Sequence, residues 1–338
     1  MITLLTDIEQ IDRTKWAEFV REHPDGCVFQ TPEFFDCWAK AGNEPSVFVA
    51  TENKQIVGVL VSVLMREKGG LKGRFSARSI IIGGPLAKND DHKIVGQLLK
   101  AHDELNKNRA IYAQIRNQSE RLGNCDTFRE CGYTFEPHLN YLVATDNADD
   151  IWKRIGKGRI KQIKKAINNG LKVEAYTPGQ VTDGLIEQGY EIISEVYRHA
   201  NLPLTDVEML KQANNQGLLY VFAVRNADGE MLGCRFGLGY KKSMYGWYAG
   251  SFSRYYSLFP NDILIWETLK WLAENGFEYF DYGGAGSPNK PYGVRSFKSQ
   301  MGGRLVDFGR FEKVYKPKTM KFAKLGFNIY RKLFKFNK

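Results

Sequence analysis

The segment 277–308 holds the residues whose types and spacing could do chemistry. A stretch rich in aromatic residues, typical of a strand, leads to Asp281, and Gly283 and Gly284 follow it closely. The sequence then predicts a loop, dense in glycine and proline, that ends at Lys298. Glycines let a backbone approach a ligand closely, and a fixed lysine supplies positive charge where negative charge binds or develops. The alternative is an ordinary surface loop whose lysine is solvated.

A second candidate is the basic segment 151–173, which contains eight lysines and arginines and no acidic residue. Its isoleucines recur near one face of a helix, and Gly170 is a natural stop for that helix. Because no acid is available for pairing one turn away, like charges repel along the helix. Such a row suits contact with phosphate groups, whereas the alternative is the solvated face that most charge runs form.

The end of the chain, 316–338, places apolar residues along one helical stripe amid lysines and arginines. A basic amphipathic helix of this kind can lie on an anionic membrane leaflet or contact RNA. It can equally pack on the body of the protein as a terminal helix. Both interpretations stay open.

The overall composition limits the class of protein. With 338 residues, 43% of them hydrophobic, the chain suits two domains with sizeable cores, and its net charge of +10 favours polyanionic partners. The five cysteines show neither a CxxC pair nor zinc-ligand spacing, which indicates reduced thiols. The first residues are too acidic and too briefly apolar for a signal peptide, and no apolar run is long enough to span a membrane. We therefore expect a cytoplasmic protein.

Both halves of the chain predict the same order of elements: a hairpin, a strand, a helix and a further strand. This order covers 46–115 in the first half and 218–281 in the second. Additional helices are predicted over 8–22 and after Thr31, a favourable N-cap that precedes a proline. The order resembles the core of the GNAT acyltransferase superfamily, used twice. We therefore expect an α/β fold with mixed sheets and two tandem GNAT-like domains.

Common enzyme signatures are absent from the sequence, including the P-loop, the GxSxG nucleophile motif and the HExxH zinc motif. The five histidines lie apart in the sequence, so surface or satisfied histidine is the better interpretation for each. A GNAT acetyltransferase would show an Arg/Gln-x-x-Gly-x-Gly/Ala loop after its central strand, and neither 83–90 nor 250–260 fits that pattern. This absence counts against ordinary dependence on CoA.

Three stretches between 151 and 308, about half of the chain, together resemble the Fem-type aminoacyltransferases. That family builds peptidoglycan interpeptide bridges and has acetyltransferase-like relatives. The three stretches are Gly158-Arg159-x3-Ile163-Lys164-Lys165-Ala166 with Gly170-Leu171-x-Val173, then Trp247-Tyr248-x-Gly250-Ser251 with Tyr256-x-Leu258-x2-Asn261, and finally Phe280-Asp281-x-Gly283-Gly284 with Gly293-x3-Phe297-Lys298-x3-Gly302-Gly303.

The resemblance implies a GNAT-like domain over 1–147, a second over 148–315 that carries the active site, and the basic tail 316–338. It implies an N-acyltransferase that transfers an amino acid from aminoacyl-tRNA to an amine on a peptidoglycan precursor, which is UDP- or lipid-linked. No metal and no dissociable organic cofactor is implied. Peripheral contact with the inner leaflet of the plasma membrane is a further expectation.

The resemblance also assigns roles to residues. Lys298 is expected to steady the negative charge that develops when the ester is attacked, with Phe297 packing beside it. Asp281 is the carboxylate nearest in sequence and is a candidate base, although a structural aspartate at a strand end is the alternative. Arg159 and Lys164 suit a diphosphate or the tRNA backbone. The remaining substrate-binding candidates are Tyr248, Tyr256, Gly283, Gly284 and Arg295, of which the two tyrosines could equally be core residues.

The chain departs from the Fem pattern in one respect. Fem proteins that bind lipid-linked precursor carry a long helical arm in the second domain, and no run long enough for such an arm occurs here. The sequence therefore resembles the armless, acetyltransferase-like branch. Two alternatives follow: an N-acyltransferase that acts on an amino sugar or lipid-linked glycan with an acyl-CoA or carrier-protein donor, and a non-catalytic module that binds RNA or membrane.

Overall fold

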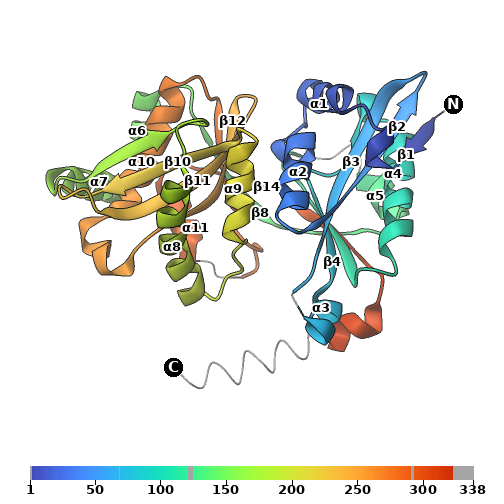
Figure 1. Cartoon of the computed structure of the whole chain (residues 1–338). Helices are drawn as coiled ribbons and strands as arrows, with labels where there is room; N and C mark the ends of the chain where they lie inside the picture. Colours follow the sequence, from blue (N-terminus) through green and yellow to red (C-terminus); the bar gives the residue numbers. More distant parts are fainter. Residues whose placement is uncertain (1, 68, 121–124, 291–292, 323–338) are drawn as a thin grey trace. The chain divides into compact units, whose positions relative to one another are not determined.

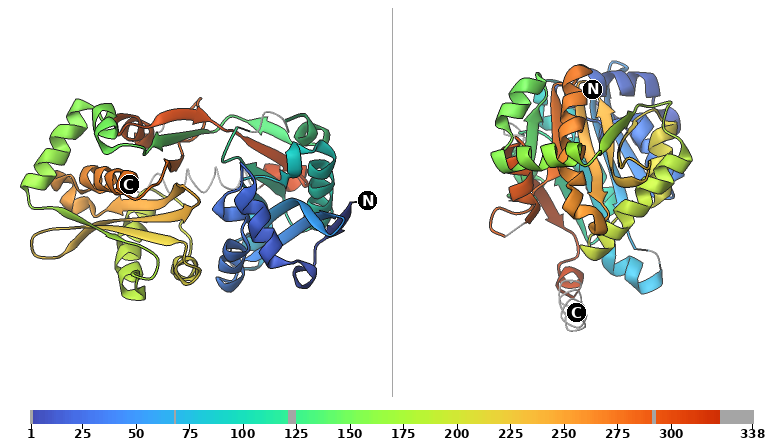
Figure 2. Two further views of the ribbon diagram at one scale, coloured as in Figure 1. Left: turned by 90° about the horizontal axis from the view of Figure 1, so that it is seen from above. Right: turned by 90° about the vertical axis from the view of Figure 1, so that its left-hand side faces the viewer.

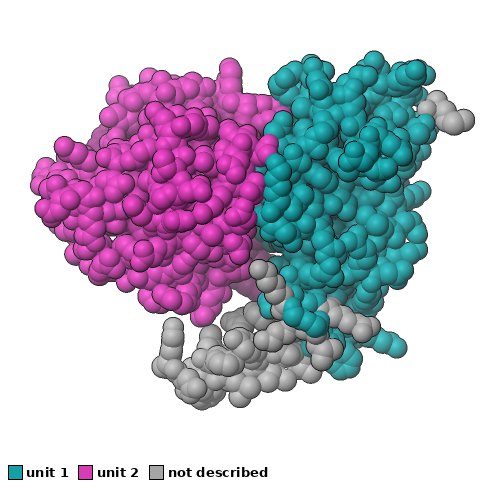
Figure 3. Space-filling model, in the orientation of Figure 1, with its two compact units in different colours: residues 1–137, 308–338 teal, residues 138–307 magenta. Residues whose placement is uncertain are grey.

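The computed structural model describes residues 2–67, 69–120, 125–290 and 293–322. Most of the predicted amphipathic tail, 323–338, lies outside the described residues. The chain forms two compact units, coloured separately in Figure 3. Unit 1 comprises Met1–Pro137 and Phe308–Lys338, and unit 2 comprises His138–Asp307.

Unit 1 is built on an eight-stranded sheet in the order β1-β2-β3-β4-β6-β15-β7, with β5 paired to β3 (Figure 1). Its strands are β1 (Thr3–Leu5), β2 (Glu44–Glu52), β3 (Gln55–Met65), β4 (Arg78–Ile82), β5 (Leu86–Ala87), β6 (Tyr112–Arg116), β7 (Thr134–Glu136) and β15 (Arg310–Val314). Its helices are η1 (Ile8–Gln10), α1 (Arg13–Glu22), η2 (Val28–Gln30), α2 (Pro32–Lys40), α3 (Gly70–Ser76), η3 (Lys88–Asp90), α4 (His92–Asn106) and α5 (Cys125–Glu130).

Local capping explains where the first helices begin. The Thr31 side chain accepts a hydrogen bond from the backbone N–H of Phe34, and Pro32 occupies the first turn of α2, as the sequence predicts. The helix predicted over 8–22 is instead divided in two. Asp7 caps η1 and Asp12 caps α1, because each aspartate offers its carboxylate to the first turn that follows it.

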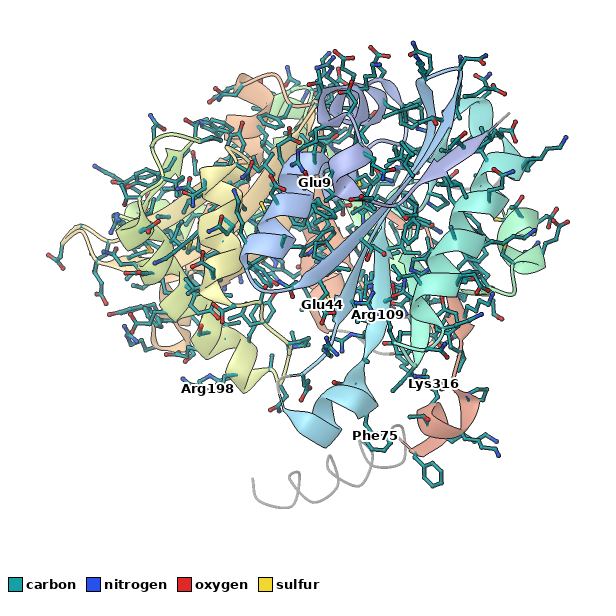
Figure 4. All side chains as sticks on the ribbon, turned by 45° about the vertical axis from the view of Figure 1, so that its right-hand side comes forward. Glu9, Glu44, Phe75, Arg109, Arg198 and Lys316 are labelled. Atoms are coloured by element: carbon teal, nitrogen blue, oxygen red, sulfur yellow. The ribbon has the colours of Figure 1, made fainter. Side chains whose placement is uncertain are left out.

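Ion pairs connect the ends of neighbouring strands on one side of the unit 1 sheet. Glu44, at the start of β2, accepts hydrogen bonds from Arg109, after α4, and from Arg66, after β3. The Arg109–Glu44 distance is 2.8 Å, and both residues are labelled in Figure 4. Both arginines are more than a third exposed, so these pairs fix geometry more than they stabilise the unit.

Unit 2 is built on a seven-stranded sheet in the order β14-β8-β13-β12-β11-β10-β9. Its strands are β8 (Leu139–Ala144), β9 (Lys172–Tyr176), β10 (Leu219–Arg225), β11 (Met231–Tyr240), β12 (Ser243–Ser251), β13 (Tyr279–Gly284) and β14 (Arg304–Asp307). Its helices are α6 (Ala148–Arg154), α7 (Lys157–Asn168), α8 (Asp183–His199), α9 (Val207–Asn215), η5 (Ser253–Leu258), α10 (Pro260–Glu274) and α11 (Gly293–Gln300). Helix α10 packs against α6, α7 and the strands, while α8 packs on β11 and β12 with α9 beside it (Figure 2).

The two units repeat one motif, which confirms the predicted tandem arrangement. In unit 1 the hairpin β2–β3 is followed by β4, α4 and β6, and β4 pairs with β6 in parallel. In unit 2 the hairpin β10–β11 is followed by β12, α10 and β13, and β12 pairs with β13 in parallel. The α/β fold class with mixed sheets is therefore confirmed.

The division of the chain differs from the expected boundary after residue 147. Strand β8, which ends at Ala144, belongs to unit 2, because Leu139, Tyr141 and Val143 pack into the core of that unit. Strand β15 belongs to unit 1, where Phe311 is fully buried against Phe128. The chain thus enters unit 2 one strand early and returns to unit 1 with one strand.

Two further expectations differ from the structure. The basic helical region is divided, because α6 ends at Arg154 and α7 begins only at Lys157. Lys298 does not end a loop but lies on α11, whose eight residues form a helix of their own. All five cysteines lie within the described residues, and none forms a disulfide. Within the described residues, no helix has the length and apolarity needed to cross a bilayer.

Candidate active site

Unit 2 contains a pocket of about 220 Å³, and residues from all three stretches that resemble the Fem family line it. Its lining residues are Arg159, Gln162, Tyr256, Phe259, Pro260, Asn261, Asp262 and Phe297. They come from α7, from the end of η5 and the start of α10, and from α11. The structure therefore brings together three predicted site residues, one from each stretch: Arg159, Tyr256 and Phe297.

Arg159 is the centre of this pocket. Its Nη1 atom donates to Asp262 Oδ1 at 3.1 Å and to Gln162 Oε1 at 2.9 Å, and its Nε atom donates to Gln300 Oε1 at 2.9 Å. The guanidinium also lies 4.7 Å from the centre of the Phe297 ring. Burial raises the pKa of Asp262, and the positive charge of Arg159 opposes that rise. This network fixes the arginine while leaving 22% of its side chain exposed to the pocket.

The turn before α10 shapes the other wall. Phe259 adopts a left-handed backbone conformation with φ 61° and ψ 42°, which is uncommon for a bulky residue. Its carbonyl accepts hydrogen bonds from the backbone N–H groups of Asp262 and Ile263, and Pro260 fills the first turn. Such strain costs about 1–3 kcal/mol and often occurs at ligand sites. The turn places Tyr256 and Asp262 on the same pocket.

Lys298 follows Phe297 in α11, but its side chain runs to the end of β13. The ammonium Nζ donates to the carbonyl oxygens of Tyr282 at 2.8 Å, Gly283 at 3.3 Å and Gly284 at 2.9 Å. Only 8% of the residue is exposed. Burial lowers the pKa of Lys298 to about 8, the charge of Asp281 opposes this change, and the charge of Arg235 adds to it.

Asp281 lies on β13 near this ammonium group. Its Oδ1 atom accepts the backbone N–H of Gly283 at 2.6 Å, and the Asn140 side chain donates to it as well. Burial raises the pKa of Asp281 to about 6, although these hydrogen bonds and the charge of Lys298 act to lower it. The structure therefore brings Asp281 and Lys298, the predicted base and the predicted cation, into electrostatic contact.

The predicted glycines and Arg295 organise the loop beside the lysine. Gly283 adopts φ +70°, and a Cβ there would lie 3.2 Å from the Tyr245 hydroxyl, so glycine suits this turn. Arg295 donates to the backbone carbonyls of Ala285, Ser287 and Lys290 at 2.8–3.3 Å. Since these bonds occupy its guanidinium, Arg295 holds the loop in place and does not line the pocket.

Two other predicted residues lie away from the pocket. The Tyr248 ring packs on Tyr197 of α8 at 5.4 Å, on the opposite side of the sheet from α10. Burial raises the pKa of the Tyr248 hydroxyl, as it does for a core tyrosine. Lys164 is exposed on α7, where only Ile163 and Ala166 are buried. The structure thus places Tyr248, which is half-buried, against α8 and Lys164 on the surface.

Sequence reasoning missed three residues at or near the site. Asp262 and Gln300 bind Arg159 from positions more than one hundred residues away, which no local pattern reveals. Arg235 is a charged residue inside the apolar strand β11, and a charged residue in such a run can be recognised in the sequence as a candidate functional residue. Within the part of the chain that the structure describes, no three His, Cys, Asp or Glu side chains gather in a way that could hold a metal ion.

The chain is similar to known proteins in one sequence segment and in its fold. Residues 194–293 match the family model described as "Acetyltransferase (GNAT) domain". FemX, a solved structure, is similar over 95% of this chain and 99% of its own, with a TM-score of 0.72 and 13% identity. L-PGS from Bacillus licheniformis is similar over 93% of this chain and 96% of its own, with a TM-score of 0.61 and 16% identity. No curated protein matches the sequence.

A tandem GNAT protein from the clavulanic acid biosynthesis pathway is also similar, over 94% of this chain and all of its own, with a TM-score of 0.61 and 10% identity. These similarities extend across both units. Residues 194–293, which carry the GNAT match, run from α8 through β13 and include the pocket turn. The match agrees with the expected N-acyltransferase class, and the predicted resemblance is confirmed in the fold: the chain has the tandem GNAT fold that FemX shares.

Proposed function

We propose that this chain forms an amide bond in unit 2 by transferring an amino acid from aminoacyl-tRNA to an amine on a peptidoglycan precursor. The observation that carries the proposal is one juxtaposition. Arg159, Tyr256 and Phe297 line a single pocket, and Phe297 shares helix α11 with the buried Lys298. The fold shared with FemX supports the same class of reaction.

The reaction begins when the amine nitrogen of the acceptor attacks the ester carbonyl carbon, forming a C–N bond and an oxyanion. Collapse of that intermediate breaks the ester C–O bond, and the leaving ribose oxygen takes up the proton that the amine loses. A buried cation near the oxyanion lowers the barrier, because the low dielectric strengthens the attraction. Lys298 is the group that we assign to this task.

Lys298 must give up one of its present hydrogen bonds before it can donate to an oxyanion. Three carbonyl oxygens occupy the three N–H donors of its ammonium group. Donation to an oxyanion therefore requires exchange of one carbonyl, and the 3.3 Å bond to Gly283 is the longest of the three. Asp281, whose pKa is raised to about 6, is still largely ionised at neutral pH and can receive the proton from the amine.

The pocket and α7 suit the phosphate groups of the substrates. Arg159 keeps part of its side chain exposed, and Lys161, Lys164 and Lys165 lie on the exposed side of the same helix. The Nη2 group of Arg159 is not engaged by Asp262, Gln162 or Gln300 and can donate to a phosphate oxygen, and nearby lysines add charge. We assign Arg159 to a phosphate of the bound substrate and the three lysines to the sequence-independent attraction of tRNA.

The acceptor is a UDP- or lipid-linked precursor in this proposal. The similarity to L-PGS concerns the fold and assigns no acceptor. A lipid-linked acceptor would bring the protein to the inner face of the plasma membrane. The positive net charge of +10 favours that surface as well as tRNA.

A second candidate is N-acyl transfer from acyl-CoA or a carrier protein to an amino sugar or a lipid-linked glycan. The match of residues 194–293 to the acetyltransferase domain favours it. The turn 250–260 lacks the expected CoA-binding pattern. Phe259 in this turn has a strained backbone conformation and lines the Arg159 pocket. For that reason we favour the aminoacyl-tRNA donor.

Filter binding with charged and uncharged bulk tRNA tests the choice of donor. We expect tRNA binding that weakens steeply between two salt concentrations and that acyl-CoA does not displace. Binding of acyl-CoA without binding of tRNA would exclude the aminoacyl-tRNA donor and favour the second candidate. A non-catalytic module would bind tRNA as well, but Lys298→Ala would leave its biological function intact.

A further inference from the structure

Arg235, in the middle of β11, is a buried cation without an ion-pair partner among the described residues. Only 7% of the residue is exposed, and its Nε atom is buried with no hydrogen-bond acceptor. Among the described residues, no carboxylate lies within ion-pair distance of its guanidinium, whereas Arg225 on the neighbouring strand pairs with Glu174 at 2.8 Å. An uncompensated buried charge is costly, so a native fold seldom keeps one without a function.

Among the residues that the structure describes, no group supplies the missing negative charge. Burial raises the pKa of Cys234 and of Tyr282, so both neighbours are neutral at physiological pH. Burial lowers the pKa of Arg235 itself to about 10, and the guanidinium therefore stays charged at neutral pH. The residues outside the described part contain neither aspartate nor glutamate.

A second unpartnered donor lies beside the arginine. The buried hydroxyl of Tyr282 on β13 has no hydrogen-bond partner, and it interacts electrostatically with the Arg235 guanidinium. The Phe280 ring, 5.1 Å from the guanidinium carbon, offers a cation–π contact but accepts no conventional hydrogen bond. Arginine and the tyrosine hydroxyl thus present several N–H and O–H donors and lack an acceptor.

The two neighbouring strands separate at this point. Strands β12 and β13 pair only over 243–245 and 279–281, although both strands continue beyond those residues. Gly246 follows the last paired residue of β12, and a Cβ there would lie 3.2 Å from Arg235 Nη1 and 2.7 Å from the Phe280 ring. The glycine therefore keeps clear the space into which the guanidinium extends.

We propose that Arg235 and Tyr282 bind a carboxylate group of a substrate, where β12 and β13 separate. A carboxylate offers two oxygens to the planar guanidinium fork and a further lone pair to the tyrosine hydroxyl. The small exposed fraction of Arg235 favours such a flat group over the larger tetrahedral phosphate. The bound carboxylate would neutralise the buried charge and satisfy both unpartnered donors.

The kind of substrate assigned to this site rests on the proposed function, but the binding experiment that tests the site does not. Arg235 acts on Lys298, since its charge contributes to the lowered pKa of the lysine. A substrate that carries a carboxylate near its reacting group would therefore be held beside the proposed reaction centre. The selected acceptors would be amino acids or peptides with a free carboxylate, in preference to neutral amino sugars.

The test uses the full chain labelled with ¹⁵N-arginine and follows the Nε–H signals by NMR. Sodium acetate, sodium phosphate and sodium chloride are titrated separately at constant ionic strength and neutral pH. Arg235→Lys identifies the Arg235 signal by its loss, and if that variant does not fold, Tyr282→Phe identifies it by its displacement. The Arg225 signal, already ion-paired, is the internal control.

We expect acetate to shift the Arg235 signal saturably, with weaker saturation by phosphate and none by chloride. Tyr282→Phe should weaken acetate binding about fivefold, the effect of one lost hydrogen bond. Absence of saturation, or an equal response to chloride, would overturn the site, and tighter binding of phosphate would overturn the carboxylate assignment. Because no turnover is measured, a negative result leaves the amide-forming activity standing, and failure of that activity leaves this result unaffected.

Discussion

At the scale of single residues, the buried Lys298 ammonium is the group on which the proposed chemistry depends. We expect Lys298→Met to lower kcat/KM for amide formation about 100-fold or more, because the oxyanion loses its cation. The measurement is transfer of a labelled amino acid by wild-type and variant protein, each checked for folding by circular dichroism. Lys290→Met, at an exposed position of the loop, is the control and should retain full activity. Equal activity of the two variants would contradict the role of Lys298.

Asp281 gives a prediction about pH. Its pKa is raised to about 6 in the folded protein from 3.8, so folding favours the protonated carboxyl. The associated stability is present below pH 3.8 and is lost as pH rises through 6, by up to about 3 kcal/mol. Chemical denaturation from pH 4 to 8 should therefore show the wild type losing stability relative to Asp281→Asn. A difference between the two proteins that does not change with pH would contradict this assignment.

The sequence identifies the residues of the site better than their contacts. Lys298 and Arg159 were predicted because glycine pairs and a row of unpaired cations are local signals, whereas Phe297 was predicted from the resemblance to the Fem family. The expectation that Phe297 packs beside Lys298 does not describe the structure, since the ring contacts Arg159 and the lysine runs to β13. Neighbouring residues on a helix point in different directions, and a predicted loop hides that divergence.

At the scale of elements, one aspartate fastens the returning strand β15 to unit 1. Asp103 on α4 accepts hydrogen bonds from Lys313 at 2.6 Å, Tyr315 at 2.6 Å and Tyr133 at 2.7 Å. His102 lies beside it, with Nδ1 at 3.2 Å from Asp103 Oδ1. Burial would raise the pKa of Asp103, but these hydrogen bonds together lower it.

We expect Asp103→Asn to destabilise unit 1 by about 3 kcal/mol, because Lys313 loses its counter-ion in a largely buried cluster. Amide hydrogen exchange in β15 should accelerate, and denaturant unfolding should report the loss. The exposed Asp126, which pairs with Arg129 on α5, provides the control Asp126→Asn. Since the pKa of Asp103 is lowered, its contribution is present above pH 3.8 and is lost as pH falls further. Unchanged exchange in β15 would contradict the fastening role.

The repeated order of hairpin, strand, helix and strand could be predicted because each element has its own periodicity and cap. The path of the chain between the units could not, since β8 and β15 are short strands whose partners are distant in sequence. Helix α11 was mistaken for a loop because Gly293, Gly302 and Gly303 surround a segment of only eight helical residues. Short helices that depend on packing carry little signal of their own.

At the scale of the whole molecule, the charge of +10 is expected to control the approach of tRNA. Replacing Lys161, Lys164 and Lys165 of α7 with glutamine should reduce the slope of log K against log salt by about 2 to 3. The control replaces the exposed Lys93, Lys100 and Lys107 of unit 1 with glutamine, which removes the same total charge. Filter binding at several salt concentrations measures both slopes. Equal slopes for the two variants would show that α7 is not the tRNA contact.

The tandem GNAT fold was predictable from element order, and its similarity to FemX extends over nearly the whole chain. A shared fold carries many activities, so the choice between donors depends on the site in unit 2. There, the Arg159 pocket, the buried Lys298 and the unpartnered Arg235 arise from contacts between distant segments. Such contacts leave no pattern in a single sequence.

The central claim is that unit 2 transfers an amino acid from tRNA to an amine, and one measurement tests it directly. Bulk tRNA charged with radiolabelled amino acids is incubated with the protein and with UDP-linked or lipid-linked peptidoglycan precursor. We predict that label moves into the precursor as an alkali-stable amide and that Lys298→Met abolishes most of the transfer. Transfer from acyl-CoA by a wild type that shows none from charged tRNA would contradict the claim.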